Sequence, residues 1–134
     1  MIVSDINLLV YLYITGQRTG EAEAVLRKDP AWAAPLLWRS EFRNTLMGLE
    51  RNQEINLDDV RTIVAEAEQW MAGREYAVVS HRVLQLAKES GCSAYDCEFV
   101  SLAMDLGIPL VTADRQVLRA FPNVAMTAEL FVKQ

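Results

Sequence analysis

Short apolar runs alternate with helical patterns along the whole chain. Four runs have the length and continuity of buried strands: residues 1–4 (MIVS), 34–38 (APLLW), 76–80 (YAVVS) and 108–112 (IPLVT). An additional edge strand is expected at Val124. Each run is followed by a segment in which apolar residues recur every three or four positions, which is the period of an amphipathic helix.

These periodic segments predict helices at residues 6–14, 20–28, 40–49, 57–71, 81–90, 94–106, 114–120 and 127–132. The clearest is 57–71. The first, INLLVYLYI, is also compatible with a strand because it is rich in β-branched and aromatic residues. Ser40 and Ser93 are expected to cap the helices that follow them.

The alternation of apolar strands with helices predicts an α/β fold with a central parallel sheet of four to five strands, flanked by helices in three layers. With 134 residues and no repeat or linker, residues 1–134 are expected to form a single domain. Functional crevices of such sheets lie beyond the carboxyl ends of the strands.

Acidic residues follow three of the predicted strands. Asp5 comes directly after the first strand, Glu41 three residues after the second, and Asp114 two residues after the fourth. Each has a simpler explanation, since Asp5 and Asp114 can cap helices and Glu41 can complement a helix dipole. Together they predict a cluster of carboxylates at one edge of the sheet.

Asp96 is a fourth candidate because it lies on an apolar helix face. At 100° per residue it shares that face with Val100 and Ala103, whereas Glu98 falls with Ser101 and Asp105 on the face expected to be solvated. Buried acids are rare unless paired or metal-bound. An arginine partner for Asp96 is the alternative.

Four converging carboxylates need a compensating charge. Two carboxylates about 4 Å apart repel by roughly 4 kcal/mol at an effective dielectric of about 20. His81 is the only histidine, which argues against a zinc site, and an all-oxygen ligand set suits Mg²⁺ or Mn²⁺. Such an ion is suited to phosphate chemistry with an activated water.

The charge and hydropathy of the chain set further limits. The formal net charge is −5, which by itself argues weakly against a nucleic-acid partner unless bound cations neutralise several acids. There is no apolar run long enough to cross a membrane and no signal-peptide pattern at the N-terminus. We therefore expect a cytoplasmic protein with no membrane partner.

The motifs VSDINLLVY (3–11), SEFRNTL (40–46), SAYDCEFVSLA (93–103) and LVTADRQVL (110–118) occur in an order and spacing that resemble the PIN-domain ribonucleases, most of all the VapC-type toxins. The resemblance extends over essentially the whole chain. It implies a metal-dependent endoribonuclease that hydrolyses RNA, belonging to a toxin–antitoxin pair.

The same resemblance implies roles for individual residues. The acidic quartet corresponds to Asp5, Glu41, Asp96 and Asp114, with Glu41 helping to position the attacking water. Asn7 and Thr112 match polar residues that orient the ligands or the phosphate. The cations nearest the motifs, which are candidates for RNA binding, are Arg39, Arg43, Arg82, Arg115 and Arg119.

The resemblance also implies a homodimer and a small antitoxin partner, for which residues 6–14 and 45–71 offer apolar surface, although most of it is expected to be core. Two other functions stay open. One is a PIN-like module that binds RNA or protein without catalysis. The other is an aspartyl-phosphate-forming phosphatase, which Asn7 disfavours because an acid is usual two residues after the nucleophile.

Overall fold

The computed structural model describes residues 1–134 and contains a five-stranded sheet in which every neighbouring pair of strands is parallel. The strands are β1 (Ile2–Ser4), β2 (Trp32–Pro35), β3 (Glu75–Tyr76), β4 (Leu110–Val111) and β5 (Ala125–Met126), in the order β3-β2-β1-β4-β5. The predicted α/β fold with a parallel sheet flanked by helices is confirmed.

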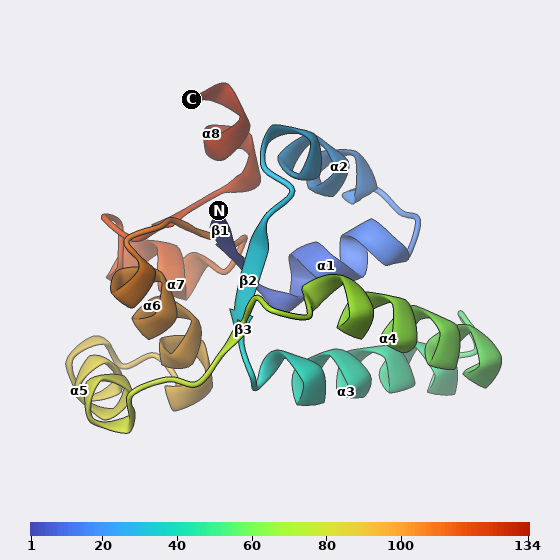
Figure 1. The fold of residues 1–134 in the computed structure, drawn as a ribbon, viewed down its shortest axis with the longest axis horizontal. Helices are drawn as coiled ribbons and strands as arrows, with labels where there is room; N and C mark the ends of the chain where they lie inside the picture. Colours follow the sequence, from blue (N-terminus) through green and yellow to red (C-terminus); the bar gives the residue numbers. More distant parts are fainter.

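Eight helices connect and follow the strands (Figure 1). They are α1 (Ile6–Tyr13), α2 (Thr19–Lys28), α3 (Trp38–Arg51), α4 (Leu57–Met71), α5 (Ser80–Ser90), α6 (Ala94–Leu106), α7 (Arg115–Ala120) and α8 (Ala128–Lys133). Helices α3 and α4 pack as a long hairpin on one side of the molecule, and α5 and α6 pack together on the other. Helix α6 lies against β1, β2 and β4.

The strands are shorter than the apolar runs that predict them. Strand β2 begins at Trp32 rather than at residue 34, and it ends at Pro35. Strand β3 stops at Tyr76 because β2, its only neighbour, extends no further. Strand β4 covers only the middle of 108–112, and the edge strand begins one residue after Val124.

The start of α3 differs from the prediction. Leu37 is its N-cap, so Ser40 lies inside the helix and does not cap it. Trp38 begins the helix, is fully buried, and donates a 2.6 Å hydrogen bond from Nε1 to Glu75 Oε1. Tertiary packing therefore sets this boundary. Ser93 caps α6 as predicted, accepting from the Asp96 backbone N–H.

The core lies between the sheet and its covering helices. Its largest fully buried side chains include Trp32, Trp38, Phe42 and Leu46, and truncation of one such aromatic to alanine costs about 3–5 kcal/mol. In the 6–14 segment Ile6, Leu8, Leu9 and Val10 are buried, and the apolar residues after them pack partly buried against the core. No helix has both the length and the hydropathy needed to traverse a bilayer.

The sheet topology places a crevice at the carboxyl ends of β1 and β4. From β1 the chain proceeds to β2 and β3 on one side, and later occupies β4 and β5 on the other. The two loops that leave β1 and β4 therefore diverge, which creates a topological switch point. The first residue beyond β1 is Asp5, and the segment beyond β4 carries Thr112 and Asp114.

Candidate active site

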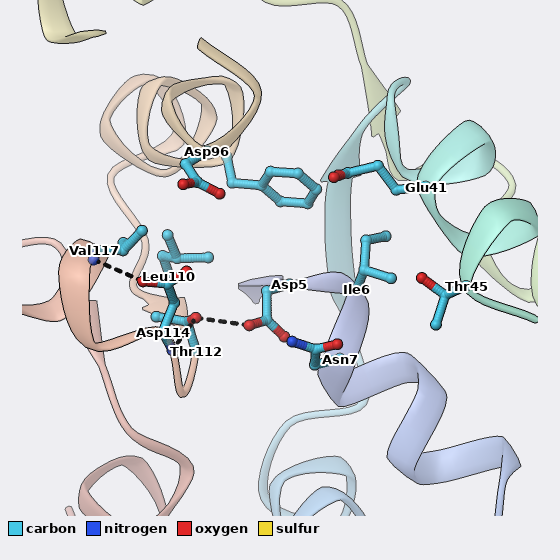
Figure 2. A pocket seen from close by; sticks show the side chains of 11 residues that line it. Asp5, Ile6, Asn7, Glu41, Thr45, Asp96, Leu110, Thr112, Asp114 and Val117 are labelled. Atoms are coloured by element: carbon cyan, nitrogen blue, oxygen red, sulfur yellow. Dashed lines mark hydrogen bonds between the residues drawn. The ribbon is translucent and has the colours of Figure 1, made fainter. Parts of the chain in front are cut away.

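A pocket of about 170 Å³ opens at the switch point (Figure 2). Its polar lining consists of Asp5, Asn7, Glu41, Thr45, Asp96, Thr112 and Asp114. The structure thus brings the four predicted acids and the two predicted polar residues to one place, from four separate segments of the chain. Their roles as ligands and catalysts stay predictions.

Asp5 is held by hydrogen bonds to both of its carboxylate oxygens. Its Oδ1 accepts from the Leu8 backbone N–H at 2.9 Å, which caps α1, and its Oδ2 accepts from Thr112 Oγ1 at 2.6 Å. The Thr112 hydroxyl in turn accepts from the Asp114 backbone N–H at 3.1 Å. Thr112 therefore links the carboxylate of Asp5 to the backbone of Asp114.

Asp114 is the N-cap of α7. Its Oδ1 accepts from the backbone N–H groups of Gln116 and Val117 at 2.9 and 3.1 Å. Its Oδ2 takes part in no hydrogen bond within the protein. Capping thus occurs at Asp5 and at Asp114, yet at Asp114 it leaves one oxygen available for a ligand.

Asp96 and Glu41 face the same pocket from helices on either side of it (Figure 2). Asp96 stands in the first turn of α6 on the side of Val100 and Ala103, which are both buried as predicted. Glu41 lies in the first turn of α3. None of the four acids forms a salt bridge, so the alternative that an arginine pairs with Asp96 is wrong.

The electrostatics of the pocket disfavour ionisation. Burial raises the pKa of Asp5, and the charge of Asp114 adds to the shift. Burial also raises the pKa of Glu41, with further contributions from Asp96, Glu98 and Asp5. The pKa of Asp96 is raised by burial and by Asp114. The acids repel one another with no basic group among the pocket's lining residues.

The two extra acids on α6 have different environments. Glu98 is half-buried, and its charge contributes to the raised pKa of Glu41. Asp105 instead forms a salt bridge with Arg82 at 2.6 Å. Ser101 is fully buried. The prediction that these three share a solvated face is therefore wrong for Ser101 and only partly right for Glu98. The reason is that α6 packs both on the sheet and on α5, which widens its buried face.

The predicted RNA-binding arginines separate into two groups. Arg39 donates to both oxygens of Glu75 and to Glu68, and Arg82 is engaged with Asp105. The other three predicted RNA-binding arginines are exposed and form no salt bridge: Arg43, Arg115 and Arg119. None of the five lines the acidic pocket.

Thr45 is a lining residue that the sequence analysis missed. It follows Glu41 by four positions on α3, and residues at that spacing share a helix face. The helical period alone therefore carried the signal. Its hydroxyl adds another oxygen to a pocket already rich in oxygen ligands.

The chemistry of the donors fits a hard divalent cation, since every polar group is a carboxylate, amide or hydroxyl. Their present spacing is wider than a single ion requires, because no three acidic, histidine or cysteine side chains are close enough to hold one. Binding an ion would therefore require side-chain rotation toward the centre of the pocket.

Comparison with known proteins gives one relative of nearly full length. Ribonuclease VapC3 from Pyrobaculum aerophilum is 27% identical over 124 residues, covering 90% of this chain and 95% of that protein. No family model matches the sequence.

Solved structures share the fold over almost the entire chain. PAE2754 from Pyrobaculum aerophilum matches with a TM-score of 0.77 at 20% identity, covering 98% of this chain and 93% of that one. FitAcB from Neisseria gonorrhoeae matches with a TM-score of 0.72 at 17% identity, covering 96% and 99%.

The chain therefore has a PIN-like fold and resembles a VapC-type ribonuclease. A toxin–antitoxin complex from Klebsiella pneumoniae also contains this fold, with a TM-score of 0.68 at 19% identity, covering 96% of this chain and 98% of that one. In the present chain, the acidic residues of all four sequence motifs line the pocket at the switch point.

Proposed function

We propose that this chain is a Mg²⁺- or Mn²⁺-dependent endoribonuclease and the toxin of a toxin–antitoxin pair. The observation that carries the proposal is the convergence of Asp5, Glu41, Asp96 and Asp114 in one pocket without a protein cation. The similarity to Ribonuclease VapC3 supports the choice of RNA as substrate.

The residues proposed to hold the ion are Asp5, Asp96 and Asp114, with Glu41 beside them. A bound divalent cation would neutralise these carboxylates, polarise the scissile phosphate and lower the pKa of a water molecule. The pair Thr112–Asp5 would keep one ligand oriented, because a hydrogen-bonded carboxylate loses rotational freedom. Asn7 lies beside Asp5 and would contact the phosphate or a ligand.

Glu41 is suited to act on the attacking water. It faces the pocket from the first turn of α3 and forms no salt bridge, so its carboxylate is available to accept a hydrogen bond or a proton from water. In the proposed hydrolysis the water oxygen bonds to phosphorus, one P–O ester bond breaks, and the leaving oxygen takes up a proton. The products are one phosphomonoester end and one hydroxyl end.

The decisive experiment is RNA cleavage with Mg²⁺ or Mn²⁺, with and without EDTA. We expect cleavage that EDTA abolishes, and its loss in Asp96→Asn. Asp58→Asn is a matched control because Asp58 is exposed at the start of α4, outside the pocket. Cleavage that persists in EDTA and in Asp96→Asn would contradict the metal site.

The two other functions have distinct outcomes in the same assay. A folded protein that binds RNA but cuts none under any metal would be a binding module. A phosphatase would release phosphate from small esters, but Asn7 stands where such enzymes usually have an acid to protonate the leaving group, which disfavours this function.

The partners belong to the same proposal. The structures that share the fold include a toxin–antitoxin complex, which supports a small protein inhibitor for this chain. A homodimer is proposed from the family resemblance. Co-purification from the native cells, followed by mass determination in solution, tests both, and a monomer without a bound protein would contradict them.

A further inference from the structure

We propose that a second cavity, beside the acidic pocket, binds the nucleotide that flanks the cleaved bond. The cavity has a volume of about 250 Å³ and shares Asp5 and Thr112 with the acidic pocket. A strand whose phosphate lies in the acidic pocket would therefore place its next nucleotide here. The proposal rests on the ribonuclease function proposed above.

The cavity contains two cations that the rest of the protein does not neutralise. Arg18 precedes α2 and Arg115 begins α7, and neither forms a salt bridge. Of its other acids, Glu129 is paired with Lys133 at 2.8 Å, whereas Glu21 forms no salt bridge. Besides the shared Asp5, the cavity thus offers two positive groups and one free acceptor, whereas the acidic pocket next to it has no basic lining residue.

Arg18 is arranged for stacking. Its guanidinium lies 5.6 Å from the centroid of the Tyr11 ring, a distance typical of a cation–π contact. The turn that carries it is tied down by Thr19, whose hydroxyl donates to the carbonyl oxygens of Tyr11 and Ile14. Single-stranded RNA bases stack on aromatic rings and on arginine planes, and their edges hydrogen-bond to polar side chains.

The opposite wall is also held in place. Thr127, Ala128 and Glu129 line it from the start of α8. Lys28 on α2 holds α8, because its Nζ donates to the carbonyl oxygens of Phe131 and Gln134. Helices α2 and α8, which both contribute residues to the cavity, are therefore joined by hydrogen bonds.

These features assign a role to each group. Arg115, adjacent to Asp114, contacts the phosphate of the flanking nucleotide. Arg18, backed by Tyr11, stacks on its base, and Glu21 accepts a hydrogen bond from a base N–H. A nucleotide supplies the anion, the planar ring and the donor that this set requires, which is why RNA fits better than an apolar peptide.

The test measures binding of short single-stranded RNA of mixed sequence by fluorescence anisotropy at several salt concentrations. The Asp96→Asn background keeps the RNA intact. We expect Arg18→Gln and Arg115→Gln each to weaken binding about tenfold. Arg115→Gln should also reduce the slope of log affinity against log salt by about 0.7, the value for one phosphate contact on a single strand.

Arg27→Gln is the matched control. Arg27 is exposed on α2, forms no salt bridge and lines neither cavity, so this variant has the same charge change and should bind as the parent protein does. Thermal melts establish that all variants fold. Equal binding by Arg18→Gln, Arg115→Gln and Arg27→Gln would overturn the subsite while leaving metal-dependent cleavage, and with it the proposed function, intact.

Two further results are decisive. Glu21→Gln should change the base preferred next to the cut when sites are mapped in RNA of random sequence, and an unchanged preference would overturn the role of Glu21. If Arg18→Gln releases a co-purifying small protein but leaves RNA affinity unchanged, the cavity serves a protein partner and the RNA subsite is wrong. If the parent protein neither binds nor cuts RNA, the proposed function fails first.

Discussion

Thr112 Oγ1 donates a 2.6 Å hydrogen bond to Asp5 Oδ2, which joins residues 107 positions apart in the sequence. The same hydroxyl accepts from the backbone N–H of Asp114. The Thr112 side chain, on the segment beyond β4, therefore connects two acids of the pocket by hydrogen bonds.

Removal of this hydroxyl should weaken both stability and activity. Thr112→Val keeps the shape of the side chain but leaves Asp5 Oδ2 without its donor, so we expect a loss of about 1–2 kcal/mol in the free energy of unfolding, measured in urea. Cleavage should fall about 10–100-fold. Thr62→Val, on the exposed side of α4, is the control, and equal behaviour of the two variants would contradict a positioning role.

Asp114 allows its structural and chemical roles to be separated. Serine is a good N-cap, so Asp114→Ser should retain the start of α7 and the stability of the protein, whereas Asp114→Ala should lose about 1 kcal/mol. Both variants should lose metal-dependent cleavage. If Asp114→Ser cuts RNA at the parental rate, Asp114 is only a cap.

Glu41 gives a prediction whose sign is unusual. Its folded-state pKa is raised, so its contribution to stability is greatest at low pH and is lost as the pH rises through the folded-state pKa. At neutral pH in EDTA, Glu41→Gln should therefore melt a few degrees above the parent protein. In Mg²⁺ the parent should gain the larger increase in melting temperature.

The matching comparison is Glu50→Gln, a substitution of the same kind near the end of α3 and outside the acidic pocket. Its melting temperature should respond to EDTA and Mg²⁺ as that of the parent does. A parent protein that is more stable than Glu41→Gln in EDTA at neutral pH would show that repulsion in the pocket is not significant.

We expect Arg39 to stabilise the fold rather than to bind RNA. It holds Glu75 and Glu68 and so links α3 to β3 and α4. Arg39→Gln should lower the midpoint of urea unfolding, while the salt dependence of RNA binding stays at the parental value. A reduced salt slope without loss of stability would instead identify Arg39 as a phosphate contact.

The sequence predicts those parts of the site that depend on local pattern. Asp5 and Asp114 stand where strands end and helices begin, and Asp96 breaks the apolar face of a periodic helix. These signals lie within a few residues of each acid. The local pattern therefore predicts these three acids and their common edge of the sheet without any knowledge of the packing.

Features that depend on packing between distant segments were not accessible in this way. The start of α3 is decided by burial of Trp38 and its bond to Glu75, not by Ser40. The cavity lined by Arg18 and Arg115 requires α2, α7 and α8 to meet, and no local sequence pattern predicts that they do. The ion pairs of Arg39 likewise join three separate elements.

The most direct test is the binding of Mn²⁺ itself, measured by electron paramagnetic resonance or calorimetry without RNA. We predict that the parent protein and Asp58→Asn bind Mn²⁺ with equal affinity, and that Asp96→Asn and Asp114→Ser each bind it at least about tenfold more weakly. Equal affinity in all four proteins, or no binding by the parent, would contradict a shared carboxylate site.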